Sequence, residues 1–136
     1  MKTLMLKTAD IEWTPGTDYF GPNAVRDGNN LASYKILSDR RAQGGGLTYL
    51  LKFSPPAGKL IKIVAVARSD EHIFPIQGDR SNKAGGALKF TGDYRLNPKG
   101  HPHSAFVAEE SVSLVVYTGE RDEVHEFAVI EPQPQN

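Results

Sequence analysis

Two side chains of this sequence could do proton-transfer chemistry, the carboxylate of Glu71 and the imidazole of His103. Positioned groups of this kind can act as general acid and base, which typically contributes ~10²–10⁴-fold to a rate. A nearby amine, Lys62, could pair with Glu71, bind an anionic substrate, or form a Schiff base with a carbonyl if its pKa were depressed. The sequence contains no cysteine, which excludes thiol nucleophiles, thiolate metal sites and disulfides.

Glu71 lies in a stretch that begins and ends with glycine. Gly58 is followed by five residues and then by Val-Ala-Val at 64–66; Glu71 comes after four more residues, and Gly78 after a further six. The segment 59–67 is rich in isoleucine, leucine and valine, which favours a strand. Gly78 followed by aspartate is typical of a tight hairpin connection. Glu71 lies between this segment and the next predicted strand, at 72–77.

His103 lies in a second stretch of this kind, which begins at Gly92. Five residues separate Gly92 from Pro-Lys-Gly at 98–100, and two more lead to His103. Proline and glycine predict a turn immediately before the histidine. His101 has the parity of His103 if the segment is extended, but Pro102 between them disturbs that argument.

Short strands must position these side chains. Turn residues recur roughly every 8–12 positions with β-prone runs between them, which is typical of a sandwich or barrel. No window shows sustained helical spacing of apolar residues, so we predict an all-β fold with little or no helix. The predicted strands cover residues 3–7, 31–37, 47–54, 59–67, 72–77, 87–91, 105–108, 112–118 and 125–130.

The two glycine-bounded stretches together resemble the two signature motifs of the cupins. In the resembling proteins the first motif carries His-x-His ahead of its glutamate, and both histidines are missing here. Val64 and Val66 stand in their places, or Ala65 and Ala67 if the spacing before Glu71 is one residue shorter. The resemblance implies a cupin jelly-roll barrel (a double-stranded β-helix) whose first motif is degenerate.

The resemblance extends over residues 10–120 and is closest to single-domain cupins. These include the cupin half of a zinc-binding anti-sigma factor and proteins similar to acetylacetone dioxygenase. In such a barrel alternate side chains of each strand point into the mouth, so the resemblance implies that Glu71 and His103 do so here.

Strand parity then predicts the pocket. If the valines point inward, the lysine two positions earlier does too, and the ligand pocket contains Lys62, Val64, Val66, Glu71 and His103. In the alanine register Lys62 points outward. In either register an apolar pair replaces two polar ligands, which favours an apolar pocket with a carboxylate and an imidazole as its polar contacts.

The histidines and glutamate of the resembling proteins bind a divalent transition metal. Only Glu71 and His103 carry over, and two protein ligands rarely hold a catalytic ion against solvent. We therefore expect no cofactor; if a divalent transition metal binds, its ligands would be Glu71, His103 and His101. His72 faces the opposite side by parity and is expected at the surface, as is the acidic run 122–126.

Length and charge limit the partners. The chain has 136 residues, 16 of them basic and 16 acidic, so neither a nucleic-acid surface nor an electrostatic membrane anchor is indicated. We expect one domain over residues 1–131, a disordered tail at 132–136, and a cytoplasmic protein, because the first residues do not resemble a signal peptide. Edge strands such as 3–7 favour a homodimer.

Three functions remain open. The first is a metal-independent protein that binds a small organic molecule in the barrel pocket, with or without acid–base catalysis such as isomerisation or elimination. The second is a metal-dependent, dioxygenase-like enzyme with an altered ligand set around Glu71 and His103. The third is a regulatory module, which the resemblance to an anti-sigma factor suggests.

Overall fold

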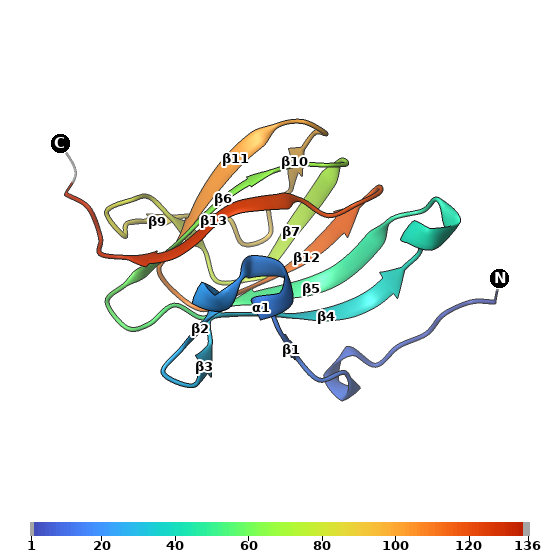
Figure 1. Ribbon diagram of the computed structural model, residues 1–136, viewed down its shortest axis with the longest axis horizontal. Helices are drawn as coiled ribbons and strands as arrows, with labels where there is room; N and C mark the ends of the chain where they lie inside the picture. Colours follow the sequence, from blue (N-terminus) through green and yellow to red (C-terminus); the bar gives the residue numbers. More distant parts are fainter. Residues whose placement is uncertain (1, 135–136) are drawn as a thin grey trace.

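The computed structural model describes residues 2–134, and β-structure dominates it (Figure 1). Helix in this part of the chain is limited to one turn, α1 (Thr17–Phe20), and 3-10 turns at Thr8–Asp10, Pro22–Ala24 and Arg41–Gln43. The strands are β1 (Thr14–Pro15), β2 (Val25–Arg26), β3 (Asn29–Asn30), β4 (Ala32–Asp39), β5 (Leu47–Phe53), β6 (Leu60–Val66), β7 (Glu71–Gln77), β8 (Arg80–Ser81), β9 (Ala87–Leu88), β10 (Arg95–Asn97), β11 (Pro102–Val107), β12 (Ser111–Tyr117) and β13 (Glu123–Ile130). The prediction of an all-β fold with little helix is confirmed.

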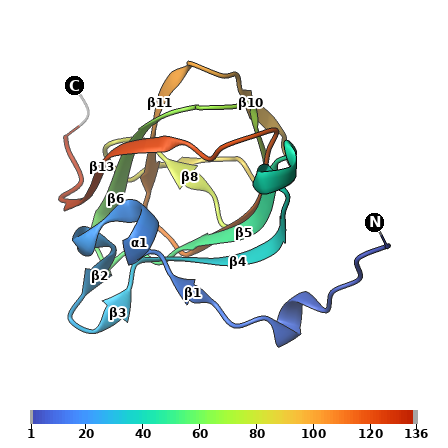
Figure 2. The ribbon, with the colours of Figure 1, turned by 45° about the vertical axis from the view of Figure 1, so that its right-hand side comes forward.

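Two antiparallel sheets face each other and together form a ring of strands when seen obliquely (Figure 2). One sheet has the order β1-β4-β5-β12-β7-β10, and the other β13-β6-β11-β8-β9. From β5 onward the chain crosses repeatedly between the sheets, as in a jelly roll. This topology brings strands that are distant in sequence to opposite walls of one interior.

The interior of the barrel is apolar and largely aromatic. Burial alternates strictly along β5 and β12, as expected for strands with one face toward a core. Phe20 of α1 packs against Phe53 and Phe127, with ring centroids 5.6 and 5.3 Å apart, so the short helix closes one end of the barrel. Burial of each such side chain stabilises the fold by about 1.5–3 kcal/mol.

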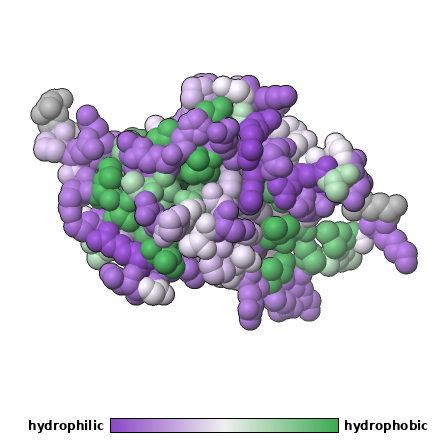
Figure 3. Space-filling view, in the orientation of Figure 1, coloured by the Kyte–Doolittle hydropathy of each residue, from purple (hydrophilic) through white to green (hydrophobic). Residues whose placement is uncertain are grey.

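The predicted strand at 3–7 is wrong. These residues have no strand partner and extend away from the barrel, leaving Leu4, Met5 and Leu6 exposed (Figures 1 and 3). The segment has β-prone residues, but no sheet edge pairs with it; the chain joins the sheet only at β1, where Thr14 lies opposite Tyr34. The short strands β1, β2, β3, β8 and β10 were not predicted.

The outer face of β7 and β10 carries a second group of exposed apolar side chains, Phe74, Ile76, Tyr94 and Leu96, which we call the outer patch. The ring centroids of Phe74 and Tyr94 are 5.1 Å apart. Because β10 is the last strand of its sheet, the outer patch extends to an open edge. The homodimer stays a prediction, and this patch is a better basis for it than segment 3–7.

The end of the chain was expected to be disordered from residue 132. Residues 132–134 form neither helix nor strand, yet the Gln133 amide donates to the Lys83 carbonyl at 2.7 Å. Residues 135 and 136 lie outside the described part, and the division into a domain at 1–131 and a tail stays a prediction. Within residues 2–134, the helices are all too short to pass through a lipid bilayer.

Candidate functional site

In strand β6 the side chains that face the interior are those of the alanine register. Ile61, Ile63 and Ala65 are buried, and Ala65 lies directly opposite His103 of β11. Opposed residues of an antiparallel pair share one face of the sheet, so His103 points inward as well. Of the two registers that the motif allowed, the one that places alanines at the histidine positions is therefore present.

The predicted contribution of Lys62, Val64 and Val66 to the pocket is wrong. All three lie on the outer face of β6 and remain partly exposed. Lys62 Nζ pairs with Glu126 Oε2 of β13 at 3.3 Å, outside the barrel. The prediction failed because both faces of β6 carry β-branched apolar residues, isoleucines inside and valines outside, and the motif spacing allowed either register.

Glu71 is held in the middle of a row of three inward-facing residues. It begins β7, opposite Asn97 of β10 on one side and Tyr117 of β12 on the other. Asn97 Nδ2 donates to Oε1 at 2.9 Å and the Tyr117 hydroxyl donates to Oε2 at 2.8 Å. The Tyr117 hydroxyl lies 3.3 Å from that of Tyr49. Glu71 is 4% exposed, and these donors replace the water that its carboxylate has lost.

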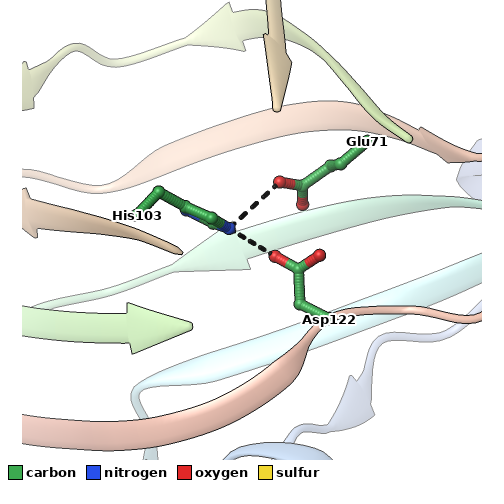
Figure 4. A group of neighbouring side chains, drawn as sticks. All are labelled: Glu71, His103 and Asp122. Atoms are coloured by element: carbon green, nitrogen blue, oxygen red, sulfur yellow. Dashed lines mark hydrogen bonds and ion pairs between the residues drawn. The ribbon is translucent and has the colours of Figure 1, made fainter. Parts of the chain in front are cut away.

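His103 links two carboxylates. Its Nε2 lies 2.7 Å from Asp122 Oδ2 and 3.6 Å from Glu71 Oε1 (Figure 4). Asp122 is 3% exposed, and its other oxygen, Oδ1, is buried without a hydrogen-bond partner among the described residues. Tyr19 of α1 fixes the backbone here by donating to the Asp122 carbonyl at 2.9 Å.

Asp122 is the residue that sequence reasoning missed. The acidic run 122–126 was expected to be solvated, and for Asp122 this is wrong. Asp122 is the last residue of the loop that connects β12 to β13, and it is buried in the barrel. Its neighbour two positions on, Val124, lines the cavity, and the register shifts between Val124 and Glu126. The apolar Val124 within the acidic run was the available signal, because Asp122 has the parity of Val124.

The pKa values of Glu71 and His103 are both raised, but burial acts on them in opposite directions. Burial raises the pKa of Glu71, and the neighbouring carboxylate of Asp122 raises it further, while the hydrogen bonds from Asn97 and Tyr117 act in the opposite direction. Burial lowers the pKa of His103, but the hydrogen bond to Asp122 and the charge of Glu71 outweigh it, and the net pKa is raised. Glu71 and His103 thus retain their protons to higher pH than they would in water.

The group forms part of the wall of a small cavity of about 60 Å³. Most of that wall is apolar or aromatic, including Ile63, Ile73 and Val115. Glu71 and His103 do line the cavity, although contact with a ligand stays a prediction. Two arginines that were not considered from sequence, Arg80 and Arg95, complete it.

The other histidines lie elsewhere. His101 is exposed, so the predicted third ligand beside Glu71 and His103 is wrong; Asp122 occupies that place. His72 faces outward as predicted, where its Nδ1 lies 2.6 Å from the Tyr94 hydroxyl.

The donor set of this group fits a divalent cation. One nitrogen and two carboxylate oxygens, from His103, Glu71 and Asp122, lie within 4.8 Å of one another, and the unpartnered Oδ1 of Asp122 is a further acceptor. Imidazole and carboxylate together suit several divalent transition metals. The positions of the first-motif histidines, Ala65 and Ala67, contribute no ligand.

Comparison with known proteins was informative only at the level of structure. No family model matches the chain, and no curated protein matches its sequence. A protein of unknown function with a cupin-like fold from Ralstonia eutropha superposes with a TM-score of 0.63 at 16% identity, over 91% of this chain and 77% of that one. An RmlC-like cupin of the same organism gives 0.63 at 18%, over 95% and 80%.

The polyketide cyclase RemF from Streptomyces resistomycificus gives a TM-score of 0.59 at 17% identity, over 99% of this chain and 89% of that one. Likeness at this level of identity concerns architecture, and the finer resemblance to an anti-sigma factor or to acetylacetone dioxygenase stays a prediction. The two-sheet topology, the inward pair Glu71 and His103, and these superpositions agree: the chain has the cupin fold.

Proposed function

We propose that this protein binds a small organic molecule in the barrel cavity and transfers a proton to or from it through Glu71, His103 and Asp122. The observation that carries the proposal is the position of His103 Nε2, 2.7 Å from one buried carboxylate and 3.6 Å from another in a cavity wall. Three titratable groups in contact can hold, release and exchange a proton among themselves.

Each residue has a distinct part in this proposal. Asp122 Oδ1 is buried and lacks a donor within the described chain, so this carboxylate has an unused acceptor position at which a proton could be taken up. His103 is hydrogen-bonded to the other oxygen of the same carboxylate and stabilises its charge. Glu71, whose pKa burial raises, supplies a second site from which a proton can be returned. Asn97 and Tyr117 hold Glu71 in place.

Isomerisation and elimination are the reactions that this equipment serves. In an isomerisation one C–H proton leaves for a carboxylate and a proton returns at another carbon or at oxygen. In an elimination the returning proton goes to the leaving group. Neither reaction needs an oxidant or a reductant, and the apolar wall strengthens the electrostatic interactions on which proton transfer depends.

Deuterium exchange tests the proposal without knowledge of the substrate. Protein dialysed against EDTA is incubated in D₂O with a panel of short ketones, aldehydes and hydroxy acids, and loss of C–H signals is followed by NMR. We expect exchange of at least one compound, greatly slowed by His103→Ala and Asp122→Asn. Lys62→Gln, on the outer face of the same sheet, is the control and should exchange normally. Equal exchange in all variants, or none with any compound, would sink the proposal.

A second candidate function is metal-dependent catalysis, favoured by the close grouping of three metal-ligating side chains. His103, Glu71 and Asp122 would hold a divalent transition metal, which would supply Lewis-acid or redox chemistry when bound. Elemental analysis and titration calorimetry with Mn(II), Fe(II), Ni(II) and Zn(II) separate the two candidates. Stoichiometric binding that Asp122→Asn abolishes would favour the metal, whereas exchange that persists after EDTA treatment would favour the metal-independent reaction.

A further inference from the structure

Two arginines from opposite sheets reach the same cavity. Arg80 belongs to β8 of the five-stranded sheet and Arg95 to β10 of the six-stranded sheet, and both line the cavity together with Glu71, His103 and Asp122. The cavity wall therefore carries cationic and anionic groups at once. The anionic side has the partners described above, whereas the cationic side has no carboxylate partner among residues 2–134.

Arg80 lacks a counter-ion. Its Nη1 donates to Ser111 Oγ at 3.0 Å, and its guanidinium lies 5.4 Å from the centre of the Phe53 ring. Among residues 2–134, no carboxylate oxygen approaches it within 4.0 Å. A guanidinium has five N–H donors, so most of the donors of this partly buried group remain free for another acceptor.

Arg95, at the more exposed rim of the cavity, also lacks a counter-ion among the described residues. Its guanidinium lies over the ring of Phe90, 4.3 Å from the centroid, and none of the ion pairs found among the described residues includes it. A face held against an aromatic ring leaves the N–H edge of a guanidinium available for a planar acceptor.

Local hydrogen bonds fix this cationic side. Arg80 pairs with Leu88 in the β8–β9 hairpin, and Asp79 Oδ1 accepts from the backbone amides of Phe90 and Thr91 at 2.8 and 3.0 Å. Asp79 thus holds the ring that supports Arg95 next to the strand that carries Arg80. The arrangement is a built feature of the chain, not two independent surface side chains.

The two like charges are costly in this position. Burial lowers the pKa of Arg80 to about 10, and the positive charge of Arg95 contributes to that decrease, while the negative charge of Glu71 acts in the opposite direction. An anion between the guanidinium groups would remove the repulsion and occupy the free donors. Arginine recognises planar carboxylates in this way, through paired N–H···O bonds.

We propose that Arg80 and Arg95 bind the carboxylate of a short organic acid, whose carbon chain then extends toward Glu71, His103 and Asp122. The inference rests on the proposed function and names its substrate class. The volume of about 60 Å³ holds roughly four waters or a ligand of similarly few heavy atoms, and the apolar walls suit an aliphatic chain. Repulsion from the two carboxylates fixes the orientation, because the ligand's own carboxylate stays at the arginine side.

A pair of isosteric probes tests this assignment. Propionate and propionamide have nearly the same shape and differ in charge, and their binding is measured by NMR titration of the backbone amides at constant ionic strength. We expect propionate to bind at least about tenfold more tightly, as for hydrogen bonds that gain a charge. Arg95→Gln and Arg80→Gln should remove that preference, while Lys62→Gln, which removes the same charge from the outer face, should keep it.

The outcomes separate this inference from the proposed function. Equal binding of the two probes, or a preference that both arginine variants retain, overturns the carboxylate assignment and leaves proton transfer on an uncharged ligand standing. A preference lost equally in Lys62→Gln overturns it too, since net charge alone would then explain it. If Arg80→Gln does not fold, Arg95→Gln at the rim decides. Failure of both probes to shift any cavity amide overturns the substrate class, whereas deuterium exchange judges the reaction separately.

Discussion

Replacement of Tyr117 by phenylalanine removes one hydroxyl from the interior and leaves the shape of the side chain otherwise unchanged. That hydroxyl donates to Glu71 Oε2 at 2.8 Å, and both residues are buried. A hydrogen bond to a charged group contributes about 1.5–3 kcal/mol, and its loss leaves a buried carboxylate oxygen without a donor. We therefore expect Tyr117→Phe to lower the free energy of unfolding by about 2–3 kcal/mol where Glu71 is ionised.

Tyr49→Phe is the matched control. It removes an equally buried hydroxyl whose partner is the neutral Tyr117 hydroxyl at 3.3 Å. A long bond between neutral groups contributes less, about 0.5–1.5 kcal/mol. The difference between the two variants thus measures the charge on Glu71.

The effect should depend on pH with a defined sign. Because the pKa of Glu71 is raised on folding from its usual 4.5, protonated Glu71 stabilises the fold below that value, and this contribution is lost as pH rises through the folded-state pKa. Tyr117→Phe removes a bond that favours the ionised form. Its cost should therefore be greater above the folded-state pKa of Glu71 than below the unfolded value.

Urea unfolding of both variants across this pH range provides the measurement, read from the midpoint and slope of each transition. A penalty for Tyr117→Phe that is independent of pH and equal to that of Tyr49→Phe would refute the reasoning. Glu71 would then be protonated throughout, or its hydrogen bond from Tyr117 would contribute nothing beyond a neutral contact.

Three further predictions concern other parts of the molecule. Asp122→Asn should lower the pKa of His103, seen by NMR titration of the imidazole, since it removes the charge that raises it; an unchanged pKa would contradict the contact. Gly46→Ala should cost at least about 2 kcal/mol in thermal or urea unfolding, because its Cβ would lie 1.8 Å from the Tyr117 carbonyl oxygen. If the outer patch mediates the predicted homodimer, Leu96→Lys should yield a monomer in sedimentation experiments, and a monomeric unsubstituted protein would refute that prediction.

The fold was accessible from sequence because β-strands with one buried face follow simple rules. The alternation of residues along 47–53 matches the observed burial, and Glu71 and His103 of the two glycine-bounded stretches line one cavity. Segment 3–7 shows the limit of such reasoning. Its composition favours a strand, but a strand exists only where another edge supplies hydrogen bonds, and that is a property of the tertiary structure.

The site was accessible only in part, for two physical reasons. The inner face of 60–66 was not identified, since both faces carry β-branched apolar residues and a one-residue slip exchanges the two faces. Arg80 and Arg95 could not be chosen because charged residues in turns and short strands are usually solvated, and nothing in their spacing shows that the barrel closes around them. For Asp122, the parity it shares with Val124 was the one signal in the sequence.

The hydrogen bonds that join Tyr49, Tyr117 and Glu71 all run in one direction, toward the carboxylate. Tyr117 has a single hydroxyl hydrogen and donates it to Glu71, so the hydrogen between Tyr49 and Tyr117 must come from Tyr49. If Glu71 takes up a proton on Oε2, the carboxyl becomes the donor and both hydroxyls can turn over, so that Tyr117 donates to Tyr49. The hydrogen bonding of the buried Tyr49 hydroxyl then depends on whether Glu71 is ionised. The ring vibrations of Tyr49 should therefore report the charge of Glu71 in infrared difference spectra.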